Sequence, residues 1–124
     1  MKLQPDRMDT LAVTAYGPGW VAVNGEKHHQ SLLITSSGVL RPWRPNRFEV
    51  LQADDFEGLL ELGVELLIFG SGQQLRFIPP AWLAPLMPHR LGVETMDTPA
   101  ACRTYNILAG EGRRVAALLL VEAP

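Results

Sequence analysis

The chain has 124 residues and a formal net charge of −2, with 47% apolar and 19% charged residues. This length fits one domain, and such a domain buries about two-thirds of its unfolded surface, so it needs no disulfide or metal to fold. The near-neutral charge gives no indication of nucleic-acid binding, and the single cysteine excludes an intrachain disulfide and fits a reducing compartment.

The first residues, MKLQPDRMDTLAV, lack the apolar run of a secretory signal and the arginine-rich, acid-poor composition of a mitochondrial transit peptide. The longest apolar run covers only residues 115–121, whereas a helix that spans a bilayer needs about 20 residues. We therefore expect a cytoplasmic protein without membrane insertion. Residues 1–10 are interpreted as an N-terminal segment that can be flexible.

The first third of the chain is predicted to form strands joined by turns. Segments rich in β-branched or aromatic residues alternate with breakers such as Gly17-Pro18-Gly19, and Asn24-Gly25 favours the tight turn of an antiparallel hairpin. His28-His29 is interpreted as part of a polar turn. Residues 39–48 contain two prolines, which predicts an extended sheet edge or a loop. The predicted strands are residues 11–16, 20–23 and 31–35.

After Phe48 the pattern changes to alternating helices and strands. Apolar residues at helical spacing predict a helix over residues 53–62, with Asp54 as its cap. A short helix is predicted over residues 80–87, because Pro80 suits a first helical turn and Pro85 limits the length. The remaining predicted elements are strands over residues 64–69, 92–96 and 114–121 and a helix over residues 98–110.

The order of these elements predicts the fold class. Strands 64–69 and 114–121 are almost entirely apolar, which is typical of strands that are covered on both faces. Their alternation with helices indicates a parallel or mixed sheet flanked by helices. We therefore predict a single α/β domain over residues 1–124, with three layers, a mixed central sheet and an N-terminal antiparallel β-meander.

Helix 98–110 is predicted to have Thr98 as its cap and Pro99 at its first position. A helical wheel places apolar or small residues around most of this helix and leaves Arg103 and Asn106 on one narrow polar stripe. The stripe is either a thin solvent face or a polar seam against another element.

A binding site is predicted where the carboxyl ends of strands 64–69 and 92–96 meet, provided that the two strands run parallel. Glycines after the first strand would let main-chain N–H groups face a ligand, and the start of helix 98–110 offers further donors, so the cleft would suit an anion. In the structural alternative, Arg103 simply pairs with Asp97 or Glu94. The candidate ligand- or partner-binding residues are Gly70, Ser71, Gly72, Glu94, Asp97, Thr98, Arg103 and Asn106.

Known chemical motifs find little support in the spacing of residues. No Gly-Lys-Ser/Thr follows Gly70-Ser71-Gly72, so this is not a phosphate loop, and the Gly-x-Ser-x-Gly spacing of a nucleophile elbow is missing. A triad of Ser71, His89 and Asp97 can be written, but no spacing supports it. His28-His29 has no third ligand nearby, so we predict no metal site, no cofactor and no catalytic residue. Cys102 is interpreted as a small packed residue.

The densest basic and aromatic cluster consists of Trp43 and the arginines Arg41, Arg44 and Arg47. We interpret it as a solvated edge, with nucleic-acid or partner binding as the weaker alternative. Nucleic acid is therefore not expected as a partner.

Several runs of residues, taken together and in this order, resemble a known family. They are YGPGWVAVNG, SLLI, LLIFGSG, GVETMDTPAACRTYNIL and EGRRVAALLL, and they extend over residues 13–121. The family is the bacterial and archaeal group of unknown function that is related to mitochondrial complex I assembly factor 3. Members often have threonine where this chain has Ser71, which keeps a hydroxyl. The signature positions are Gly70, Gly72, Glu94, Met96, Asp97, Thr98, Ala101, Arg103, Thr104, Tyr105, Asn106, Glu111, Arg113 and Arg114.

The resemblance implies a three-layer fold on a mixed sheet and no established enzymatic activity. We therefore expect a non-enzymatic interaction or assembly protein, with a role in respiratory-complex assembly and a protein partner of unknown identity. The alternative is a small-anion or metabolite-binding protein, or an unrecognised enzyme, that uses the cleft between residues 70–72 and helix 98–110. There Arg103 would hold a carboxylate or phosphate with two hydrogen bonds, and Asp97 or Glu94 would act as a general base.

Overall fold

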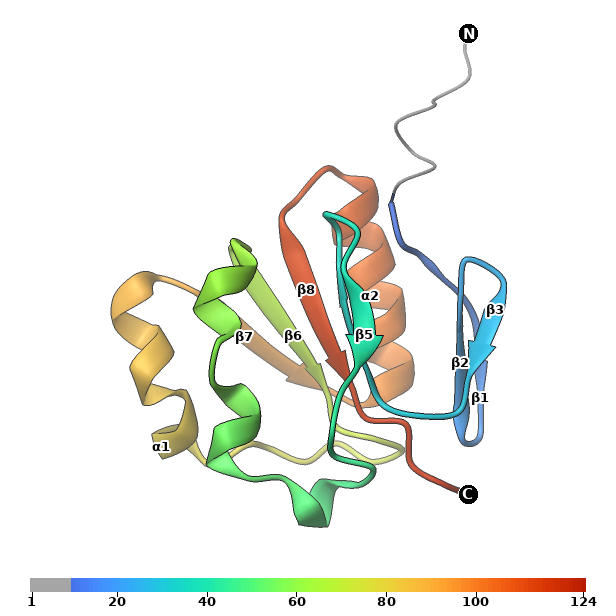
Figure 1. The fold of residues 1–124 in the computed structure, drawn as a ribbon, viewed down its shortest axis with the longest axis horizontal. Helices are drawn as coiled ribbons and strands as arrows, with labels where there is room; N and C mark the ends of the chain where they lie inside the picture. Colours follow the sequence, from blue (N-terminus) through green and yellow to red (C-terminus); the bar gives the residue numbers. More distant parts are fainter. Residues whose placement is uncertain (1–9) are drawn as a thin grey trace, which may run out of the picture.

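The computed structural model describes residues 10–124 and contains two β-sheets (Figure 1). The first sheet is antiparallel and consists of β1 (Val13–Gly17), β2 (Trp20–Val23) and β3 (Glu26–His28) in this order. The second sheet has five strands in the order β5-β4-β8-β6-β7. β6 pairs in parallel with β7 and β8, and β4 pairs antiparallel with β5 and β8, so the predicted mixed sheet is confirmed. Its strands are β4 (Leu32–Thr35), β5 (Leu40–Pro42), β6 (Leu66–Gly70), β7 (Gly92–Met96) and β8 (Val115–Leu119).

Helical segments cover both faces of the five-stranded sheet. The long helix α2 (Thr98–Gly110) packs on one face together with the first sheet, and shorter segments pack on the other face (Figure 1). The predicted three-layer α/β fold with an N-terminal meander is therefore confirmed. The shorter segments are the 3-10 helices η2 (Phe48–Val50), η3 (Ala53–Phe56), η4 (Leu59–Leu62) and η5 (Ala84–His89) and the α-helix α1 (Pro80–Leu83).

β8 is buried on both sides, which explains its unbroken apolar sequence. Val115 and Leu119 belong to the core beneath α2, whereas Ala116 and Leu118 belong to the core beneath the shorter helices. Successive side chains of a strand point to opposite faces, so a strand between two cores needs an apolar residue at every position. β8 therefore connects the two cores at the centre of the molecule.

The prediction of a helix over residues 53–62 is wrong. The chain forms η3 and η4 instead, and they are separated by Gly58, which has a left-handed φ of 78°. Glycine adopts this conformation without the strain that a Cβ imposes, so it interrupts a helix easily. The cap is also displaced: η3 follows Gln52, whose N–H donates to the Asp55 carboxylate at 2.8 Å, and Asp54 does not cap it.

The short helix predicted over residues 80–87 is confirmed only in part. α1 ends at Leu83, and the chain continues as η5, which extends to His89. Pro85 and Pro88 lie in this second segment, and proline cannot donate the hydrogen bonds that a regular α-helix requires.

Two further boundaries differ from the prediction. His28 belongs to β3, where it pairs with Val21, so the interpretation of His28-His29 as a turn is wrong for the first histidine. The cap of α2 is Asp97, whose carboxylate accepts the Ala100 N–H at 2.8 Å, and Thr98 is the first residue of the helix. The cap of α2 therefore lies one residue before the predicted one. The sequence does not distinguish the two positions, because both Asp97 and Thr98 have side chains that suit a cap.

No helix in the described part of the chain, residues 10–124, is long and apolar enough to cross a membrane. The segment 1–10 that the sequence predicts to be flexible lies, except for Thr10, outside the described residues.

Candidate functional site

β6 and β7 bring two loops to one edge of the sheet. The two strands run parallel, as predicted, and their last residues, Gly70 and Met96, lie opposite each other. The Ser71 N–H donates to the Met96 carbonyl oxygen, and the Thr98 N–H donates to the Gly72 carbonyl oxygen, each at 2.8 Å. The loop after β6 therefore lies against the start of α2, at a shared rim.

The glycines of this rim allow close packing. A Cβ on Gly70 would lie only 3.0 Å from the Thr98 Oγ1 and 3.1 Å from the Ala101 Cβ, so the absence of a side chain lets α2 approach β6. Gly72 has a φ of +98°, and a Cβ there would overlap the Glu122 carboxylate. Both positions therefore suit glycine for reasons of packing and backbone conformation.

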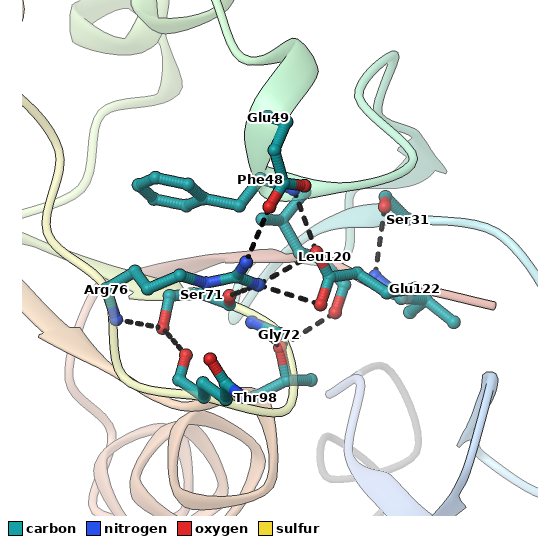
Figure 2. Close-up of polar contacts among 11 residues, drawn as sticks. Ser31, Phe48, Glu49, Ser71, Gly72, Arg76, Thr98, Leu120 and Glu122 are labelled. Atoms are coloured by element: carbon teal, nitrogen blue, oxygen red, sulfur yellow. Dashed lines mark hydrogen bonds and ion pairs between the residues drawn. The ribbon is translucent and has the colours of Figure 1, made fainter. Parts of the chain in front are cut away.

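Thr98 connects three segments of the rim. Its buried Oγ1 accepts the Gly72 N–H at 2.9 Å and donates to the Leu120 carbonyl oxygen at 2.7 Å. The hydroxyl therefore joins α2 to the loop after β6 and to the residues that follow β8 (Figure 2). Its hydrogen atom is used within the protein.

The main-chain donors at the start of α2 are also used. Thr98 N–H bonds to the loop after β6, Ala100 N–H bonds to the Asp97 carboxylate and Ala101 N–H bonds to the Asp97 carbonyl oxygen. Pro99 has no N–H. An anion at this helix start would have to replace hydrogen bonds that already exist.

Ser71 is fully buried and organises the loop after β6. Its Oγ donates to the Gln74 carbonyl oxygen at 2.6 Å and accepts the Arg76 N–H at 3.0 Å. Both contacts lie within the same loop, so the hydroxyl shapes the loop and is not directed at an open cleft.

An ion pair that the sequence analysis did not predict holds this rim together (Figure 2). The Arg76 Nη2 donates to both carboxylate oxygens of Glu122 at 2.8 Å and to the Ser71 carbonyl oxygen at 2.9 Å. The Arg76 Nη1 donates to Glu49 at 3.1 Å, and Glu122 also accepts the Phe48 N–H at 2.8 Å. The side chains of Arg76 and Glu122 are only 24% and 14% exposed, so the pair lies partly out of water. It joins the loop after β6, the segment after β8 and η2.

Asn106 is one of the two residues of the polar stripe on α2, and its side chain bonds to the main chain of β1. Its Oδ1 accepts the Val13 N–H at 2.8 Å, and its Nδ2 donates to the Val13 carbonyl oxygen at 2.7 Å. Beside it, the Tyr105 hydroxyl donates to the Leu11 carbonyl oxygen at 2.8 Å. At Asn106 the stripe is therefore a seam that attaches the start of β1 to α2.

Arg103, the other residue of the polar stripe, is exposed to solvent. Its Nη1 donates to the Tyr16 hydroxyl at 2.6 Å. Within residues 10–124, no ion pair joins Arg103 to Asp97 or Glu94, which the structural alternative had suggested. Glu94 lies in β7 opposite Ile68, where it is exposed at the sheet edge and apart from the rim.

A pocket of about 240 Å³ lies between the β1–β2 turn and the rim. We call it the turn pocket. It includes Gly72 and Thr98 of the predicted site, but the other predicted residues do not line it. The sequence pattern gives no indication of its outer wall, the turn around Pro18, because Gly17-Pro18-Gly19 is typical of any segment that ends a strand. The lining residues are Tyr16, Gly17, Pro18, Gly19, Trp20, Val21, Gly72, Gln73, Thr98, Pro99, Leu120, Val121 and Glu122.

Cys102 is 1% exposed in the core beneath α2. Burial raises the pKa of its thiol from 9.0 to about 12, because the thiolate would lose its hydration, and the nearby charge of Arg103 offsets only part of this effect. Burial raises the pKa of the Tyr105 hydroxyl as well. Neither group is prepared for nucleophilic chemistry near neutral pH.

The basic cluster around Trp43 contains one two-pronged ion pair. Arg44 donates through Nε and Nη2 to the two oxygens of the Asp55 carboxylate, at 2.8 and 2.6 Å. These hydrogen bonds hold the pKa of Asp55 below its usual value. Arg41 and Arg47 are exposed.

Among residues 10–124, no group of three or more His, Cys, Asp or Glu side chains is arranged to hold a metal ion.

The arrangement of these elements defines a class of fold. A crystal structure of a protein from Bordetella parapertussis is similar, with a TM-score of 0.84 and 36% identity over 90% of this chain and 96% of that chain. A solution structure from Bordetella pertussis, described as an Mth938-like domain, has a TM-score of 0.82 and 32% identity over 99% and 94% of the two chains. The structure named MT938, at 22% identity and a TM-score of 0.65, shares the fold. The chain thus has an Mth938-like α/β fold.

The chain belongs to the family described as Protein of unknown function (DUF498/DUF598), whose model matches residues 13–120. An uncharacterized protein of Rhodobacter capsulatus is 34% identical over 119 residues, which are 94% of this chain and 90% of that protein. NADH dehydrogenase (ubiquinone) 1 alpha subcomplex assembly factor 3 is 36% identical in Mus musculus and 26% identical in Bos taurus, over 95% of this chain. The chain spans 64% and 65% of the length of these two assembly factors. The resemblance read from the sequence is therefore confirmed.

Proposed function

We propose that this chain is a non-enzymatic assembly factor that binds a protein partner in the cytoplasm and assists the assembly of a respiratory NADH dehydrogenase complex. The names of its relatives in Mus musculus and Bos taurus support the second part. The observation that carries the proposal is a contrast at the rim. The hydroxyl groups of Ser71 and Thr98 bond within the protein, whereas the loop after β6 exposes apolar side chains.

The exposed apolar edge belongs to residues 75–78. Leu75 is 54% exposed and Phe77 is 68% exposed, whereas Arg76 reaches inward to Glu122 and Ile78 is buried. This alternation places Leu75 and Phe77 on the outer side of an irregular segment that Arg76 holds in place. Aromatic and apolar side chains of this kind are common in the buried centres of protein interfaces. The edge is therefore the proposed contact surface.

Deleting the gene in its own host tests the proposal. If the chain acts in assembly, native electrophoresis of membrane extracts will show less complete NADH dehydrogenase complex and more of its partial assemblies. The wild-type gene will restore the complex, and Phe77→Asp will not, because a carboxylate cannot be buried in an apolar interface without a large loss of hydration.

Val39→Asp is the matched control. Val39 is an apolar residue with 37% exposure, and it lies between β4 and β5 at the opposite edge of the sheet. It should restore the complex as the wild type does. Unchanged complex levels after deletion of the gene would contradict the proposal.

A small-molecule binder remains the second candidate, because the turn pocket lies at the carboxyl ends of β6 and β8, where ligands collect in open α/β sheets. A thermal-shift screen of carboxylates and phosphates tests it. A ligand at about 100 times its dissociation constant adds about 2.7 kcal/mol to the free energy of unfolding. Unchanged melting temperatures across the screen would count against this candidate.

A further inference from the structure

Two aromatic residues that line the turn pocket are each in contact with a positively charged side chain. The Arg103 guanidinium is bonded to the Tyr16 hydroxyl at 2.6 Å, and the Lys27 ammonium lies 4.2 Å from the centre of the Trp20 ring. The ion pairs found within residues 10–124 include neither Arg103 nor Lys27. Each cation therefore lies beside a residue that lines the pocket, Arg103 at Tyr16 and Lys27 at Trp20.

The acidic groups near the pocket do not neutralise these cations. Among residues 10–124, Glu122 is the one acidic residue that lines it, and both of its oxygens accept hydrogen bonds from Arg76. The Asp97 carboxylate accepts the Ala100 N–H at the start of α2. Within residues 10–124, neither of these two carboxylates is paired with Arg103 or Lys27.

The size and the walls of the pocket favour a side chain over a free metabolite. Its volume of about 240 Å³ is below the range of about 300–1,000 Å³ that is common for small-molecule sites. Its walls include Trp20, Pro18 and Pro99, which suit an apolar group. The chain itself places a proline at the edge of the pocket: Pro124 packs so closely on Gly19 that a Cβ there would lie 2.8 Å from its Cδ.

We propose that the turn pocket binds an acidic segment of a protein partner. An apolar side chain or a proline ring of that segment enters the pocket, and a neighbouring carboxylate bonds to Arg103. One N–H group of the Arg103 guanidinium donates to the Tyr16 hydroxyl, and its other N–H groups can hold a carboxylate with charge-assisted hydrogen bonds. This inference rests on the proposed function, because it names the chemistry of the partner.

A peptide display library of random extended segments, screened on the purified full chain, tests the proposal. Enriched peptides should contain Asp or Glu close to Pro or a branched apolar residue. Their binding should change the fluorescence of Trp20, measured in a variant with Trp43→Phe and Trp82→Phe, and should weaken as salt is added.

Arg103→Gln should weaken the binding of these peptides about tenfold or more, because it removes the charge from the hydrogen bonds. Arg41→Gln is the matched control, since Arg41 is exposed on β5 and should have no effect. Melting temperatures close to the wild type will show that both variants are folded. Enriched peptides without acidic residues, equal binding by both variants, or a library without enriched peptides would each overturn the proposal.

The same two variants separate this inference from the proposed function. If Arg103→Gln restores the NADH dehydrogenase complex in the deletion strain as fully as Arg41→Gln does, while Phe77→Asp fails, the acidic-segment proposal is wrong and the assembly function stands. If deletion has no effect on the complex but acidic peptides still require Arg103, the proposed assembly role is wrong and the binding site stands.

Discussion

The hydroxyl of Thr98 shows how one side chain can hold the rim. It accepts a hydrogen bond from Gly72 and donates one to Leu120, so it joins segments that lie 26 and 22 residues away in the sequence. The sequence pattern favours Thr98 as a helix cap and gives no indication of either partner. The sequence therefore predicts a structural role for Thr98 as a helix cap, whereas its observed role is to join three segments of the rim.

Thr98→Val should lower the free energy of unfolding by about 3 kcal/mol, because it leaves the Gly72 N–H and the Leu120 carbonyl oxygen buried without partners. Thr98→Ser keeps the hydroxyl and should lose much less. Urea unfolding, followed by tryptophan fluorescence, measures both values. A larger loss in Thr98→Ser than in Thr98→Val would mean that the methyl group, and not the hydroxyl, holds the rim.

Cys102 gives a second prediction at the residue scale. Its pKa rises from 9.0 to about 12 on folding, so above pH 9 the unfolded chain loses a proton that the folded chain retains. The stability that Cys102 contributes is therefore complete below pH 9 and decreases as the pH rises towards 12. Cys102→Ala should have a flatter decline of unfolding free energy across this window. Parallel declines in the two proteins would contradict the assignment, because Tyr105, whose pKa burial also raises, is present in both and contributes equally to each.

The elements of the chain were predictable to different degrees. Buried strands such as β6 and β8 follow from their apolar runs, and the tight turn between β2 and β3 follows from Asn24-Gly25, because these signals are local. The short 3-10 helices were not predictable, since Gly58 interrupts a pattern whose apolar spacing still fits a helix. The polar stripe of α2 was recognised, but its partner β1 was not, because Asn106 and Val13 lie 93 residues apart.

The attachment of β1 to α2 can be tested at this scale. Asn106→Asp removes the donor to the Val13 carbonyl oxygen and places a negative charge against it. Hydrogen exchange of the β1 and β2 amides should become about tenfold faster or more, while β6 and β8 keep their protection. Ile107→Ala, on an exposed position of the same helix, is the control and should leave both sheets unchanged. Equal loss of protection in both sheets would show that the N-terminal sheet does not open separately.

At the scale of the whole molecule, the rim joins parts of the chain that no local pattern connects. Arg76 and Glu122 lie 46 residues apart, and together they hold the loop after β6, η2 and the segment that follows β8 (Figure 2). The same loop provides Gln73 to the turn pocket and carries the exposed Phe77. Both proposed contact surfaces therefore depend on one ion pair, which sequence spacing could not have indicated.

A double-mutant cycle on Arg76 and Glu122 measures this dependence. Glu122→Gln should lower the free energy of unfolding by about 2 kcal/mol, because it leaves a guanidinium that is only 24% exposed with the exposed Glu49 carboxylate as its remaining ion-pair partner. Adding Arg76→Met to Glu122→Gln should lower stability by less than the sum of the single changes, since the poorly compensated charge is then gone. Arg113→Gln, in the exposed pair with Glu65, is the control and should change stability very little. Additive effects of the two substitutions would mean that the pair does not couple the loop to the rest of the fold, and the contact surface on residues 75–78 would then need another anchor.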